Sequence, residues 1–126
     1  MTQQRSALVV DDSGVVRKVA RRILEKHGFL VREAADGAEA LLACRAELPS
    51  LILLDRNMPV LDGIGFLREL RPESGPDEPV VVMCTTEAAT DRILEGLEAG
   101  AQEYVMKPFD ESILVAKLTQ VGLLTA

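Results

Sequence analysis

The stretch LILLD (51–55) joins a continuous apolar run, 51–54, to an acidic residue, and VVVMC (80–84) is a second uninterrupted apolar run. Short runs of this kind predict strands that are buried on both faces, as at the centre of a parallel sheet. Further runs predict strands at 6–10, 29–33 and 103–106. Strands 29–33 and 103–106 carry charged residues, so we expect them at the borders of the sheet.

A helical pattern of about ten or more residues follows each predicted strand. Five βα units with right-handed crossovers, and with strands 29–33 and 103–106 outermost, permit the strand order 2-1-3-4-5. The predicted fold class is therefore α/β, a doubly wound five-stranded parallel sheet of the flavodoxin-like (βα)5 type. Local signals predict helix caps at Asp36, Asp62 and Asp110, helix-ending glycines at Gly28 and Gly100, and a surface loop over RPESGPDEP (71–79).

The chain has 126 residues, which predicts a single domain over 1–126. A hydrophobic fraction of 48% is enough for a core, and a net charge of −6 disfavours binding to nucleic acid or anionic membranes. No apolar run is long enough to insert into a membrane, and two cysteines are too few for a disulfide scaffold, so we expect a cytoplasmic protein. Three phenylalanines, one tyrosine and no tryptophan offer little for stacking against a flavin or nucleic-acid bases.

Four of the predicted strands end in polar residues: Asp11-Asp12, Asp55, Thr85-Thr86 and Lys107. Parallel strands share one carboxyl edge, where α/β sheets bind ligands, so we expect these side chains to meet. Three adjacent carboxylates require a compensating cation, and carboxylates with a main-chain carbonyl and water are ligands that Mg²⁺ prefers. Any one of these acids alone is better explained as a helix cap, but the whole group at one edge predicts a functional site.

Asp55 is the predicted nucleophile, because it ends a central strand while Asp11 and Asp12 form a pair suited to the metal. Lys107 supplies a cation and Thr85 a hydroxyl, which together favour the negative charge of a phosphoryl transition state. The expected product is an aspartyl phosphate.

Four segments, LVVDDS (8–13), LLDRNMPVLDG (53–63), VMCTTEA (82–88) and AGAQEYVMKPF (99–109), resemble the response-regulator receiver family of two-component signalling, above all its single-domain chemotaxis (CheY-type) members. The resemblance implies a phosphorelay switch that takes a phosphoryl group from a histidine kinase, uses Mg²⁺, and is no enzyme beyond its own phosphotransfer and dephosphorylation. It also implies an output partner, such as a flagellar motor switch component, bound by strand 103–106 with the helix before it and the helix at 110–124.

The same resemblance implies a role for individual residues. It makes Asp55 the phosphoacceptor, Asp11, Asp12, Asp55 and the main-chain carbonyl of Asn57 the Mg²⁺ ligands, Lys107 a phosphoryl contact, Thr85 and Tyr104 the switch pair, and Asn57 and Glu87 the residues that tune hydrolysis. The Lys107–Pro108 bond is implied to be cis. Thr86 and Arg56 depart from the pattern, since a smaller residue is frequent in place of Thr86 and several chemotaxis members have an aromatic residue in place of Arg56.

Two helices each permit a functional and a structural interpretation. In the helix after 6–10, we expect Val16, Val19, Ala20, Ile23 and Leu24 to point inward, and the basic residues of 17–26 to point largely outward. That basic face is either a docking patch for a kinase's phosphotransfer domain or simply solvated. The helix at 110–124 has more apolar residues than one buried face needs, which predicts either a partner surface or a tail packed on its own core.

Other functions use similar residues. A small haloacid-dehalogenase-like phosphatase also has an aspartate nucleophile, but Asp follows that nucleophile two residues on, where this chain has Asn57. A flavodoxin-like electron carrier would bind a cofactor phosphate where this chain has acids. Within the receiver interpretation, a phosphate sink or a stand-alone receiver outside chemotaxis is the alternative to a motor effector.

Overall fold

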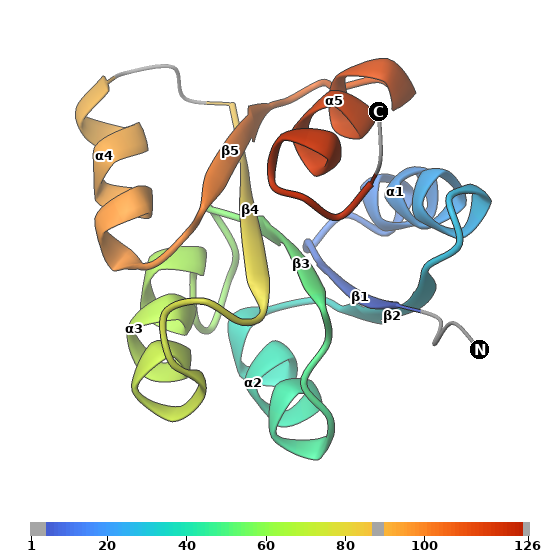
Figure 1. The fold of residues 1–126 in the computed structure, drawn as a ribbon. Coiled ribbons are helices and arrows are strands. Elements are labelled where there is room, and N and C mark those ends of the chain that lie inside the picture. The colour runs from blue at the N-terminus through green and yellow to red at the C-terminus, as the bar shows by residue number, and fades with distance from the viewer. Residues whose placement is uncertain (1–4, 87–89, 125–126) are drawn as a thin grey trace.

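A computed structural model describes residues 5–86 and 90–124, with strands and helices alternating along the chain (Figure 1). The strands are β1 (Ser6–Val10), β2 (Leu30–Ala34), β3 (Leu51–Asp55), β4 (Val80–Thr85) and β5 (Glu103–Met106). The helices are α1 (Gly14–Lys26), α2 (Gly37–Ala46), α3 (Gly63–Ser74), α4 (Thr90–Ala99) and α5 (Glu111–Gln120). All the predicted strands are present, and their ends move by at most one residue.

The strands form one parallel sheet in the order β2-β1-β3-β4-β5, which confirms the predicted doubly wound α/β fold and its two edge strands. Val10 of β1 pairs with Leu54 of β3, and Leu54 pairs in turn with Met83 of β4. Thr85 at the end of β4 pairs with Met106 at the end of β5. This register brings the carboxyl ends of four strands to one edge, which we call the carboxyl rim.

Helices cover both faces of the sheet (Figure 1). One core lies between the sheet and helices α1 and α5, and the other lies on the opposite face, under α2 and α3. Because successive side chains of a strand point to opposite faces, β3 contributes to both cores, and all five of its residues are buried. None of the helices in the described residues is long and apolar enough to cross a membrane.

The predicted helix signals are confirmed. The side chains of Asp36, Asp62 and Asp110 each accept a hydrogen bond from a backbone N–H three residues further on, at the start of α2, α3 and α5. Gly28 and Gly100 follow α1 and α4 with positive φ, the left-handed region that glycine enters without a steric penalty.

The predicted loop over 71–79 is wrong at its start, because α3 continues through Pro72 to Ser74. Proline near the end of a helix removes only one backbone donor. Beyond the proline, the guanidinium of Arg71 donates to the carbonyls of Gly75 and Pro79 and so fixes the chain where it leaves the helix.

Candidate functional site

The carboxyl rim brings together the polar residues that the sequence singled out. Asp55 ends β3, Thr85 ends β4, and Asp11 and Lys107 directly follow β1 and β5. Asp11 and Asp55 are 3% and 6% exposed, whereas Asp12 is open to solvent. Asp11, Asp12 and Asp55 each offer a carboxylate oxygen within 4.8 Å of the others. The predicted acidic group therefore exists, with two buried members and one exposed member.

Local hydrogen bonds hold the Asp11 carboxylate in place. The backbone N–H of Ser13 donates to Asp11 Oδ1 at 2.9 Å, and Ser13 itself caps α1 by accepting from the N–H of Val16 at 3.3 Å. Arg17 donates from Nη1 to the main-chain carbonyl of Asp11 at 2.6 Å. The start of α1 thus orients Asp11 through its side chain and its backbone.

Lys107 joins the two buried carboxylates. Its Nζ lies 2.6 Å from Asp11 Oδ2 and 3.2 Å from Asp55 Oδ1. Its backbone N–H donates to the carbonyl of Thr85 at 2.8 Å, which fixes the strand end that carries it. The Lys107–Pro108 bond is cis, as the family resemblance implied.

The electrostatics of this group follow from burial and charge. Burial raises the pKa of the Asp55 carboxyl, and the neighbouring Asp11 carboxylate raises it further, while the Lys107 ammonium acts against both. Burial favours the neutral amine of Lys107, but its hydrogen bond to Asp11 and the charge of Asp55 together raise the pKa of Lys107 above its ordinary value. The lysine therefore stays charged beside two acids.

The acidic group fits a hard divalent cation. Three carboxylates outnumber the single lysine, so like-charge repulsion remains for a cation to relieve. Oxygen ligands with one side open to water match the preferences of Mg²⁺. Asn57, the predicted fourth ligand, is exposed beside this group, and its N–H lies 3.4 Å from Asp55 Oδ1.

The remaining predicted residues lie at different depths. Thr85 is buried at the rim. Tyr104 lies further from the rim, paired with Met83 in the sheet and partly buried against the α2–α3 core, with Lys117 Nζ 4.8 Å from its ring centroid. Glu87 falls outside the described residues.

The sequence analysis missed two arginines. Arg17 was expected to point outward, but it binds the Asp11 carbonyl and pairs with Glu33 on β2 at 3.0 Å. The sequence signal that could have predicted this pairing is Glu33, an acid on the edge strand that follows the basic helix α1. Arg56 was noted only as an unusual residue, yet it is 5% exposed and pairs with Glu95 on α4.

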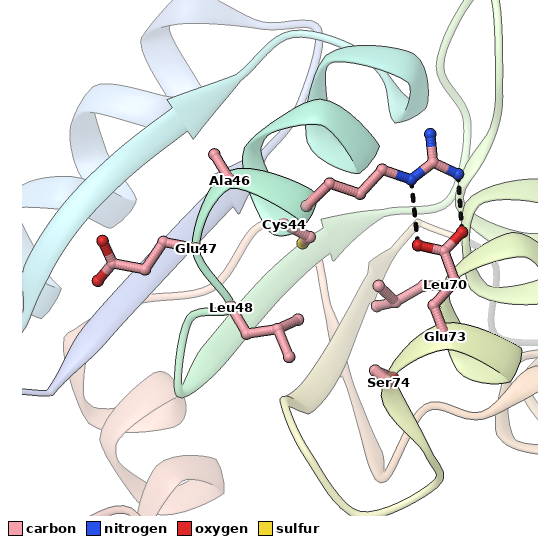
Figure 2. A pocket seen from close by; sticks show the side chains of 8 residues that line it. Cys44, Ala46, Glu47, Leu48, Leu70, Glu73 and Ser74 are labelled. Carbon is pink, nitrogen blue, oxygen red and sulfur yellow. Dashed lines mark hydrogen bonds and ion pairs between the residues drawn. The ribbon is translucent and has the colours of Figure 1, made fainter.

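The structure also contains two cavities, one remote from the acidic group and one beside it. A cavity of about 360 Å³ lies between the carboxyl ends of α2 and α3, at the opposite end of the strands from the acids (Figure 2). Arg45 and Glu73 form a two-bonded ion pair across it. Cys44 lines this cavity, and burial raises the pKa of its thiol to about 11, so the thiol stays protonated and unreactive.

A second hollow, of about 400 Å³, opens beside Lys107 between α1 and the loop that joins β5 to α5. Val15, Val16, Val19, Pro108 and Phe109 make its lining mainly apolar. The sequence pattern placed Val19 in the core, but it is 48% exposed, because α1 turns this residue toward the hollow and not toward the sheet.

Comparisons with known proteins agree with this geometry. The family model described as the response regulator receiver domain matches residues 7–119. The transcriptional regulatory protein CseB of Streptomyces avermitilis is 41% identical over 121 residues, which are 96% of this chain and 50% of that protein. The probable transcriptional regulator ycf27 of Pyropia yezoensis is 44% identical over 119 residues, 94% of this chain and 48% of that protein. The chain spans about half the length of these curated relatives.

Among solved structures, the chemotaxis response regulator CheY4 of Vibrio cholerae superposes with a TM-score of 0.88 at 34% identity, covering 94% of this chain and 99% of that one. A response regulator from Chloroflexus aurantiacus superposes with a TM-score of 0.87 at 29% identity, covering 94% of this chain and 98% of that one. Neither the phosphatase nor the electron carrier finds support in these likenesses. The chain belongs to the response regulator receiver domain family.

Proposed function

We propose that this chain is a phosphorelay switch in which Asp55 accepts a phosphoryl group from the phosphohistidine of a kinase. The observation that carries the proposal is the contact of the buried Asp55 carboxylate with Lys107, within an acidic group of three members. Receiver domains of this family interact with histidine kinases and output domains. We assign the whole of 1–126 to one receiver domain that acts in the cytoplasm.

The transfer is a displacement at phosphorus. A carboxylate oxygen of Asp55 forms the new P–O bond, the P–N bond to the histidine breaks, and the imidazole leaves with a proton from solvent. Lys107 pairs with the phosphoryl oxygens and Thr85 donates its hydroxyl to one of them. The phosphoryl group is removed by hydrolysis, a separate reaction: water attacks phosphorus, the P–O bond to Asp55 breaks, and inorganic phosphate leaves. Asn57 and Glu87 tune the rate of this step.

Mg²⁺ would be held by Asp11, Asp12, Asp55 and the main-chain carbonyl of Asn57. When bound, it supplies positive charge that offsets the charge of the entering phosphoryl group. The chain's own residues do the rest: Ser13 and Arg17 orient Asp11, and Lys107 holds the two buried carboxylates at a fixed separation.

The output signal passes through Thr85 and Tyr104 to a surface formed by α4, β5 and α5. Charge-assisted hydrogen bonds contribute roughly 1.5–3 kcal/mol each, whereas moving a two-state equilibrium from 1:99 to 99:1 needs about 5.5 kcal/mol. Phosphorylation therefore biases the surface and partner binding completes the change. Leu94 on α4 and Ile113 on α5 are large apolar residues of these helices that are exposed.

The kinase docks on the other side of the rim, at the hollow beside Lys107. Val15 is 73% exposed there, next to the lysine that contacts Asp55. Of the basic residues on α1, Arg17 and Arg21 are paired with Glu33, and Lys26 with Glu111, so Lys18 and Arg22 are the exposed cations left to steer an acidic partner.

Two output systems are candidates. The match to almost the full length of CheY4 favours a chemotaxis effector, with a flagellar motor switch component as the partner. The higher identity to CseB and ycf27 favours the phosphoreceiving part of a transcriptional regulator. A phosphate sink, which needs a kinase but no output partner, is the alternative to both. Affinity capture with and without phosphorylation separates them by the partner retained.

The decisive experiment is phosphorylation by acetyl phosphate. With Mg²⁺ present, the chain should gain one phosphoryl group that is labile in base, and it should gain none when the metal is chelated. Asp55→Asn should abolish the labelling, whereas Asp77→Asn, which removes an exposed acid from the loop before β4, should leave it intact. Full labelling of Asp55→Asn would place the nucleophile elsewhere.

A further inference from the structure

Helix α4 has less fully buried apolar surface than its neighbours, because its apolar residues Ile93, Leu97 and Ala99 are only partly buried. Gly96 is its only fully buried residue, and Leu94 is half exposed. Helix α3, which lies beside it on the same face, buries Gly63, Ile64, Phe66, Leu67 and Leu70 (Figure 1). Because stabilisation by burial scales with apolar area, burial holds α4 much more weakly than α3.

Arg56 attaches α4 to the rest of the fold through polar contacts. This residue directly follows Asp55, and its guanidinium is buried. Its Nη1 donates to the main-chain carbonyl of Arg92 at 2.9 Å, and its Nη2 pairs with the carboxylate of Glu95. Both partners belong to α4, so the Arg56 side chain binds this helix through a backbone carbonyl and through a carboxylate.

The other end of Arg56 is fixed as well. Its backbone N–H donates to the carbonyl of Cys84 on β4 at 3.2 Å, and its carbonyl accepts from the N–H of Gly63 at the start of α3, at 3.0 Å. Arg56 therefore ties the backbone that carries Asp55 to α4, because its own backbone is bonded to β4 and α3 and its guanidinium is bonded to α4.

We propose that Arg56 is a positioning residue that couples Asp55 to helix α4. The inference rests on the proposed phosphorylation of Asp55 and adds the route by which that event reaches the surface of α4, β5 and α5. A buried guanidinium that loses its partners destabilises the fold strongly, so the bonds to Arg92 and Glu95 keep Arg56 and α4 in one relative position. A displacement of the backbone at Asp55 must then either move α4 or break these bonds.

Hydrogen exchange of α4 amides tests the coupling without knowledge of the partner. It is measured on the full chain, with and without acetyl phosphate and Mg²⁺, for peptides over 90–99 and 64–74. In the wild type, phosphorylation should change exchange over 90–99 by at least about threefold, a size typical of coupling through a contact network. Glu95→Ala should speed this exchange about threefold without phosphorylation, and phosphorylation should then change it by less than half as much.

The matched control is Glu98→Ala, the same substitution at an exposed position of the same helix. It should behave as the wild type, and exchange over 64–74 should be unchanged in both variants. Arg56→Met, which removes the buried charge and keeps apolar volume, should reproduce Glu95→Ala, and Arg56→Lys should restore part of the coupling. A purely structural role would change 64–74 as well.

The outcomes separate the two proposals. If Asp55 of the wild type takes no phosphoryl group, the proposed function fails. If Asp55 is labelled and Glu95→Ala exchanges as Glu98→Ala does, Arg56 is not the link. A fully labelled wild type in which α4 exchange does not change would also overturn the coupling.

Discussion

Two polar clusters lie at opposite ends of the same strands, and they differ in how their charges are satisfied. At the amino end, the guanidinium of Arg71 donates to the carbonyls of Gly75, Pro79 and Gly100 and to the side chain of Gln102. At the carboxyl rim, Lys107 contacts two of three clustered carboxylates. The first cluster is complete within the chain, whereas the second retains net negative charge that a cation can offset.

What separates the functional cluster from the structural one is the repulsion between like charges at the rim, and not burial alone. Neutral carbonyls around one guanidinium leave no group that needs a ligand. Like charges gathered at the ends of two strands, β1 and β3, are held there by the fold at a cost in stability, which proteins accept at functional sites. The predictions below test this contrast, from the largest expected effect to the smallest.

Arg71→Met should produce the largest loss of stability, about 3 kcal/mol, because the carbonyls of Gly75, Pro79 and Gly100 lose the donor that they share. Urea unfolding followed by circular dichroism measures the change. The loss should be the same with and without Mg²⁺, since this cluster is remote from the acids. If Mg²⁺ restored the lost stability, the Arg71 cluster would be coupled to the acidic group, and the contrast between the two ends of the sheet would not hold.

Mg²⁺ should stabilise the wild-type chain by about 2.7 kcal/mol at a concentration one hundred times its dissociation constant, because it binds the folded rim and not the unfolded chain. Asp11→Asn removes one of the three clustered carboxylates and should greatly reduce the gain. Arg71→Met should keep the gain in full. Equal stabilisation of Asp11→Asn would mean that the ion binds elsewhere.

The sequence predicted which residues meet at the carboxyl rim better than which residues meet at the amino ends of the strands. Asp11, Asp55 and Lys107 each follow an apolar run, so the parallel topology alone brings them together. Arg71 lies in a stretch with three prolines and a glycine, and the continuation of α3 depends on carbonyls presented by Gly100 and Pro79 from other segments. The ion pair between Arg56 and Glu95 likewise depends on the position of α4 against the sheet, which no local sequence pattern encodes.

An acid near the rim that belongs to a helix cap should behave differently from the clustered acids. Asp62 accepts from the N–H of Gly65 at 2.8 Å and caps α3. Asp62→Ala should therefore destabilise the chain by about 1 kcal/mol, the usual loss for such a cap. Chemical unfolding should show the same difference with and without Mg²⁺. A marked dependence on Mg²⁺ would add Asp62 to the metal site.

Asp55→Asn should produce the smallest change, and one of opposite sign. Burial, with the charge of Asp11, raises the pKa of Asp55 in the folded chain above its ordinary value of 3.8, although Lys107 offsets part of this. The folded state then binds the proton more tightly than the unfolded state, so the wild type loses stability as the pH rises from 3.8 through the raised pKa. The Asn variant escapes that loss and should be slightly more stable than the wild type at pH above this window when no divalent ion is present.

The advantage of Asp55→Asn should shrink as the pH falls through the same window, because the wild-type carboxyl becomes neutral there. Saturating Mg²⁺ should reverse the order, since the wild type then gains binding energy through a ligand that the variant lacks. Urea unfolding across pH, with Asp77→Asn as the control for loss of an exposed acid, measures both effects. If Asp55→Asn were less stable than the wild type at neutral pH without Mg²⁺, Lys107 would outweigh burial and Asp11, and the rim would be as complete within the chain as the cluster around Arg71.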